Sequence, residues 1–96
     1  MSRPVVFRFR LYVADDALNS AQAQANLMAL CRTYLADRYE IDLVDVFKEP
    51  QRALIDGVFM TPTLIRLAPL PVRRIVGTLS QTDVVLRALD VDGGTA

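Results

Sequence analysis

Few side chains in this 96-residue protein could do chemistry: it has one cysteine, Cys31, and no histidine. Cys31 lies within an apolar helical pattern, where a buried, inert thiol is expected. Asp15 and Asp16 fall in a loop, while Asp42 and Asp45 would point to opposite faces of a strand, so neither pair predicts a catalytic dyad. The lack of histidine removes the commonest general base and the commonest metal ligand, and the scattered glycines form no phosphate loop. By elimination, we expect a binding function with no cofactor or metal.

Two basic stretches are candidate binding surfaces. Lys48-Glu49-Pro50-Gln51-Arg52 combines the only lysine with a predicted helix start at the carboxyl end of a strand, where α/β folds expose their loops. An ordinary solvated helix end is the competing interpretation. Arg73 and Arg74 would point to opposite faces of a strand, and there we expect simple solvation of a sheet edge. Arginine dominates the basic residues, and its planar fork suits paired contacts at interfaces.

Composition narrows the class of protein. A content of 52% hydrophobic residues in 96 supports one compact domain with one core. Eleven basic and eleven acidic residues cancel, so no basic surplus draws the chain to nucleic acid. The apolar runs fall short of the roughly 20 residues that span a bilayer. Arg8 and Arg10 interrupt the N-terminal apolar segment, so it does not read as a signal peptide. A cytoplasmic protein without internal disulfides is expected.

The first half of the chain predicts a strand, a helix and a second strand. Arg8 and Arg10 alternate with apolar residues in the first strand, and Asn19 or Ser20 is expected to cap the helix. The segment 39–47 is expected to be a strand that enters a sheet covered on both faces. This order predicts a right-handed parallel βαβ unit. The apolar positions of the first strand and of the helix are Val5, Phe7, Phe9, Leu11 and Val13, then Leu27, Leu30, Cys31, Tyr34 and Leu35.

The second half predicts a short helix, a hairpin and a last helix. Pro50 suits a first helical turn, and Gly57 suits the position just after a helix end. The β-rich segments 63–67 and 72–76 flank the proline-rich segment 68–71 and predict an antiparallel hairpin.

The last helix is expected to begin at a capping box. Ser80 and Asp83 are spaced for that box, and Val85, Leu86 and Leu89 would form its buried face. Residues 91–96 are expected to be a frayed tail on an ordered core of about residues 5–90. The sequence therefore predicts a single thioredoxin-like domain over residues 1–96, with the element order βαβαββα.

Thioredoxin chemistry is not expected in this domain. It needs two cysteines where the first strand meets the first helix, and residues 14–20 contain none. Pro62 sits where such folds place a cis-proline, and we expect its role to be structural.

An ordered set of motifs identifies the family that this chain resembles. The motifs are LYVA at 11–14, NS at 19–20, VDVFKEPQ at 44–51 and TPTLIRLAPLPVRRIVGTLS at 61–80. Together they resemble the KaiB family of circadian-clock proteins, from about Val6 to Asp90.

The resemblance implies a non-enzymatic protein that binds the hexameric ATPase KaiC. In the family a histidine kinase with a KaiB-like sensory domain competes for that ring. The resemblance implies docking contacts at Lys48, Glu49, Pro50, Gln51 and Arg52, with Leu54 as an apolar neighbour. A monomer or weak homo-oligomer is expected.

The resemblance also implies two folds for the second half of the chain. Family members switch between a tetrameric βαββααβ ground state and a monomeric thioredoxin-like state that binds KaiC. Clock-type members carry glycine at the position of Ala88, and alanine favours a helix by about 1 kcal/mol. We therefore expect the thioredoxin-like state to dominate. Pro62, Gly77, Ala88 and Asp90 are the positions expected to matter for the structure or the switch.

The favoured function is a regulatory protein that binds a KaiC-type ATPase in timing or stress regulation. One alternative is a thioredoxin-like redox or sensor module acting through Cys31 or Pro62. Another is a KaiB-like domain that docks to a histidine kinase or another clock-type component.

Overall fold

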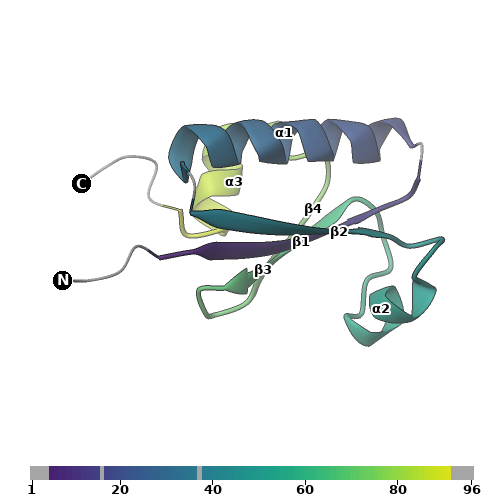
Figure 1. The fold of residues 1–96 in the computed structure, drawn as a ribbon. Helices are drawn as coiled ribbons and strands as arrows, with labels where there is room; N and C mark the ends of the chain where they lie inside the picture. Colours follow the sequence, from purple (N-terminus) through teal and green to yellow (C-terminus); the bar gives the residue numbers. More distant parts are fainter. Residues whose placement is uncertain (1–4, 16, 37, 92–96) are drawn as a thin grey trace.

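A four-stranded mixed sheet forms the centre of the protein (Figure 1). The computed structural model describes residues 5–15, 17–36 and 38–91. The strands lie in the order β2-β1-β3-β4; β1 pairs with β2 in parallel and with β3 antiparallel, and β3 pairs antiparallel with β4. Their bounds are β1 Phe7–Val13, β2 Tyr39–Asp45, β3 Thr63–Ala68 and β4 Arg73–Val76.

The helices divide between the two faces of the sheet. The long helix α1 (Leu18–Tyr34) and α3 (Thr82–Ala88) lie on one face, and the short helix α2 (Pro50–Ile55) lies on the other (Figure 1). The order β1-α1-β2-α2-β3-β4-α3 confirms the predicted βαβαββα arrangement, including the parallel βαβ unit and the antiparallel hairpin.

The larger core layer lies under α1 and α3. Phe9 and Leu11 of β1 are almost inaccessible to solvent, as are Leu27 and Cys31 of α1 and Leu89 after α3. Each large apolar side chain buried in this way stabilises the fold by roughly 1.5–3 kcal/mol. The predicted stripes of β1 and α1 are confirmed, except that Val5 is 49% exposed and Tyr34 is only partly buried.

The smaller core layer lies under α2. It consists of five buried residues, Tyr12, Val44, Ala53, Val58 and Ile65. Ala53 is the only buried residue of α2 itself. Apolar packing therefore holds α2 to the sheet at a single position, and its other attachments are polar.

Both predicted helix caps are wrong. α1 begins at Leu18, before Asn19, and the hydroxyl of buried Ser20 instead accepts a hydrogen bond from the Ala14 N–H at 2.9 Å. That bond ties the end of β1 to the first turn of α1. α3 begins at Thr82 without a side-chain cap, so Ser80 and Asp83 form no capping box. The buried face of α3, at Val85, Leu86 and Leu89, is confirmed.

The prediction for the second strand is wrong in its length, and the strand is less buried than expected although helices cover both faces of the sheet. β2 ends at Asp45, and its place at the edge of the sheet leaves Leu43 44% exposed. Only Val44 is buried within the strand. Phe47, the end of the apolar run, lies in the following turn and is 74% exposed. Period-two patterning does not report whether a strand has a neighbour on both sides.

The last described residue, Val91, packs into the core. It is 7% exposed, and its N–H donates to the Leu86 carbonyl at 2.9 Å. The rest of the predicted tail, residues 92–96, lies outside the described residues.

Candidate functional site

The predicted docking residues lie around the start of α2. Lys48 and Glu49 precede the helix, and Pro50 occupies its first turn, as predicted. Gly57 follows the helix with φ +66°, the left-handed conformation that glycine adopts without strain. Five residues, Lys48, Glu49, Pro50, Gln51 and Arg52, line one surface hollow of about 400 Å³. Leu54 lies outside that lining and is 69% exposed.

Among the predicted docking residues, Arg52 also holds α2 in place. Its guanidinium donates to the carboxylate of Asp42 on β2 and, at 3.3 Å, to Glu49. Asp42 also accepts from the Arg10 Nε at 3.0 Å. Partial burial opposes ionisation of Asp42, but the hydrogen bonds from Arg52 and Arg10 outweigh it and lower the pKa of this carboxyl. Arg52 therefore joins α2 to β2 as well as facing the hollow.

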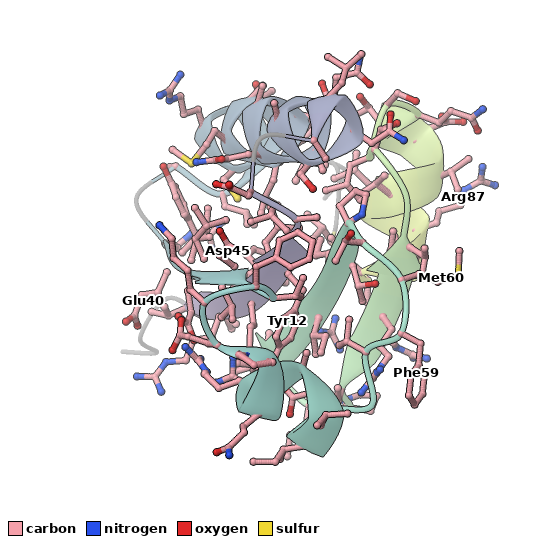
Figure 2. All side chains as sticks on the ribbon, turned by 90° about the vertical axis from the view of Figure 1, so that its right-hand side faces the viewer. Tyr12, Glu40, Asp45, Phe59, Met60 and Arg87 are labelled. Atoms are coloured by element: carbon pink, nitrogen blue, oxygen red, sulfur yellow. The ribbon has the colours of Figure 1, made fainter. Side chains whose placement is uncertain are left out.

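A second polar cluster fixes the other end of α2. The Asp56 carboxylate accepts from the Tyr12 hydroxyl at 2.5 Å and from Arg10 Nη1 at 2.9 Å. These donors lower the pKa of Asp56. Burial and the bond to Asp56 raise the pKa of Tyr12 to about 12. Figure 2 shows Tyr12 between α2 and the sheet, so one buried phenol serves the small core and this cluster together.

Arg73 and Arg74 do more than solvate a sheet edge, which corrects the sequence-based expectation. Arg73 donates from Nε and Nη2 to the Asp90 carboxylate, at 3.2 and 3.0 Å. Arg74 donates to the carbonyl oxygens of Asp56 and Gly57, so it binds the end of α2. These pairs join residues 17 and 18 positions apart, and local spacing gave no signal for them.

Arg66 is a structural residue that the sequence reasoning missed. Its side chain is almost fully buried and donates to the carbonyl oxygens of Leu89 and Pro71. Its Nε has no hydrogen-bond partner among the described residues, and the Asp90 carboxylate lies 3.9 Å from Nη1. An arginine in an otherwise apolar strand was the available signal.

The proposed fold-switch positions lie in the second half of the structure. The Thr61–Pro62 peptide bond is cis, and the Pro62 carbonyl accepts from the Gly77 N–H at 3.0 Å. Gly77 has φ +126°. Ala88 is the last residue of α3, and Asp90 follows it with φ 55°. None of the four lines the hollow beside α2.

The junction of β1 and α1 carries no thiol, and Cys31 lies far along α1. Cys31 is 0% exposed, and burial raises its pKa to about 12. A thiol held neutral in this way is a poor nucleophile. Among the described residues, no group of three His, Cys, Asp or Glu side chains is placed to hold a metal ion. No helix in that part of the chain is long and apolar enough to cross a membrane.

The fold defines the class of protein as thioredoxin-like. Mitochondrial thioredoxin 3 of Saccharomyces cerevisiae superposes with a TM-score of 0.71 at 18% identity, covering 91% of this chain and 80% of that one. The N-terminal domain of Synechococcus elongatus SasA superposes with a TM-score of 0.73 at 15% identity, covering 100% of this chain and 94% of that one.

Sequence comparison gives the family within that class. The KaiB domain family matches residues 10–91, and this chain belongs to it. The circadian clock protein KaiB3 of a Synechocystis species is 42% identical over 82 residues, which are 85% of this chain and 80% of that protein. The circadian clock oscillator protein KaiB of Synechococcus elongatus is 40% identical over 91 residues, which are 95% and 89% of the two chains.

Proposed function

We propose that this chain is a non-enzymatic regulatory protein that binds a KaiC-type hexameric ATPase through the surface around α2. Membership of the KaiB family carries the proposal, since the resemblance implies that the thioredoxin-like state is the one that binds KaiC. The exposure of Lys48, Glu49, Pro50 and Gln51 around one hollow supports it.

The docking role of Arg52 is combined with a structural one. Its side chain is 35% exposed and pairs with Asp42 and Glu49. A loss of binding after replacing Arg52 would therefore mix a missing contact with a displaced helix. Lys48 is the better probe, because it is exposed and has no carboxylate within 4.0 Å among the described residues.

Size-exclusion co-elution with the KaiC-type ATPase of the same organism, in ATP and in ADP, tests the proposal. We expect a nucleotide-dependent complex with the wild type and a weaker one with Lys48→Glu. Arg32→Glu is the matched control, because Arg32 is exposed on α1, which lies on the other face of the sheet from α2 (Figure 1), and like Lys48 it has no carboxylate within 4.0 Å among the described residues. No complex under either nucleotide would overturn the proposal and direct the search to a histidine kinase or another clock-type partner.

A redox role is the competing function, and a single variant tests it. A catalytic Cys31 would have to leave the core and ionise, against the burial that raises its pKa to about 12. We expect no disulfide reductase activity from the wild type. Reductase activity that Cys31→Ser abolishes would support the redox function instead.

A further inference from the structure

Four large apolar side chains are exposed at the end of α2 and in the loop to β3. Leu54, Ile55, Phe59 and Met60, here called the apolar ridge, are 69%, 83%, 87% and 64% exposed. Figure 2 shows Phe59 and Met60 projecting away from the ribbon. Scattered single apolar residues are normal on a surface, whereas an exposed cluster of them is typical of an interaction site, and these four fall within seven consecutive residues.

The orientation of this segment is the reverse of what solubility alone would favour. The one charged residue within it, Asp56, turns inward and binds Tyr12 and Arg10, while Arg52 just before it pairs with Asp42. Val58 turns inward as well, and its N–H donates to the Ala53 carbonyl at 2.8 Å. The polar contacts that hold α2 to the sheet therefore present the ridge to solvent. A covering partner would remove that apolar area from water.

The charge beside the ridge indicates the chemistry of the partner. Arg74 binds the carbonyl oxygens of Asp56 and Gly57, so its guanidinium lies in the middle of the segment that carries the ridge. Those acceptors are uncharged, and the Asp56 carboxylate faces Arg10 and Tyr12. A second copy docked ridge to ridge across a twofold axis would bring two Arg74 cations together, which is unfavourable. A partner with carboxylates around an apolar groove would complement both features.

We propose that the apolar ridge is the main anchor of the docking surface, inserting into an apolar, acid-rimmed groove on the KaiC-type ATPase. This inference rests on the function proposed above. It shifts the binding energy from the polar stretch around Lys48 to Ile55, Phe59 and Met60, with Arg74 as the ionic neighbour. Anchors of this kind dominate interfaces, while the surrounding polar contacts contribute less.

Equilibrium titration of the ATPase with matched variants tests the inference. Phe59→Ser combined with Met60→Ser removes half of the ridge without touching a buried residue. Leu70→Ser is the control, because Leu70 is 79% exposed but lies beyond the other end of β3. We expect the double variant to bind at least roughly tenfold more weakly and the control to bind like wild type. Circular dichroism and thermal melts of all three proteins would show whether the fold is retained.

The outcomes separate this inference from the function beneath it. Equal binding by wild type and the double variant would overturn the ridge as anchor and leave the ATPase proposal standing. No binding by wild type would overturn both. Concentration-dependent self-association that the double variant abolishes, measured by sedimentation, would assign the ridge to a second copy and overturn the inference.

Discussion

The Tyr12 hydroxyl and the Asp56 carboxylate form a 2.5 Å hydrogen bond between residues 44 positions apart. It joins the carboxyl end of β1 to the end of α2, and Arg10 Nη1 donates to the same carboxylate oxygen. With one buried residue in α2, this cluster and the Arg52–Asp42 pair decide how α2 sits on the sheet.

The free energy of unfolding should fall at acidic pH because the Asp56 carboxylate becomes protonated. Its pKa lies below the usual 3.8 in the folded protein, so its contribution is complete above about pH 3.8 and is lost as the pH falls through the lower folded value. At pH 7, Asp56→Asn should cost roughly 1–3 kcal/mol. The difference from wild type should shrink as the pH falls below 3.8. Urea unfolding of both proteins at pH 7, 5, 4 and 3 measures this difference.

Asp83→Asn, at an 80% exposed position, is the control and should change the free energy of unfolding little. A cost that does not vary with pH would contradict the assignment.

Two arginines on β1 should differ sharply in their contribution to stability. Arg10 is 25% exposed and binds both Asp42 and Asp56, whereas Arg8 is 63% exposed and binds only Glu40 among the described residues. Arg10→Gln should cost roughly 1–3 kcal/mol, because two carboxylates lose a charged donor. Arg8→Gln should cost about 0–1 kcal/mol, as exposed ion pairs do. Chemical denaturation gives both values, and hydrogen exchange should show α2 amides opening faster in Arg10→Gln alone. Equal costs would show that the cluster does not hold α2.

Periodic apolar patterns predicted the helices and strands of this fold. They could not predict the hydrogen bonds and ion pairs between residues far apart in the sequence. The alternation in β1, the stripe of α1 and the Pro50 and Gly57 signals depend on neighbouring residues, so the sequence carries them directly. The sequence predicted a helix cap at Asn19 or Ser20. It could not show that the Ser20 hydroxyl accepts from the Ala14 N–H instead, because that contact depends on where β1 ends. The family resemblance predicted Arg52 as a docking residue. Its ion pair with Asp42 could not be predicted, because that pair depends on how α2 lies against β2.

The buried Arg66 should be among the costliest single residues to truncate. Its two hydrogen bonds satisfy the carbonyl oxygens of Leu89 and Pro71, which join the end of α3 to the turn between β3 and β4. Arg66→Ala would leave both acceptors unsatisfied beside a cavity, so a loss of roughly 3–5 kcal/mol is expected. Arg73→Ala is the control: Arg73 is 46% exposed, binds the Asp90 carboxylate that lies 3.9 Å from Arg66 Nη1, and should cost about 0–1 kcal/mol when truncated. Denaturant midpoints compare them, and a cost for Arg66→Ala near that of Arg73→Ala would contradict the structural role.

Ala88 should favour the helical form of the C-terminal segment. α3 spans only Thr82–Ala88, so each residue's helix propensity is a large share of its local stability. Ala88→Gly should cost up to about 1 kcal/mol, since Ala88 is the last residue of the helix and the full penalty applies to helix interiors. Ala25→Gly should cost a similar amount within α1, at an exposed position outside the segment expected to switch.

Backbone chemical shifts of the wild type should be helical over residues 84–88, and a second set of resonances should grow in Ala88→Gly but not in Ala25→Gly. Extended shifts over that segment in the wild type would show that the thioredoxin-like fold is not the resting state. A second set appearing equally in both variants would assign the effect to global stability and not to a local choice between two folds.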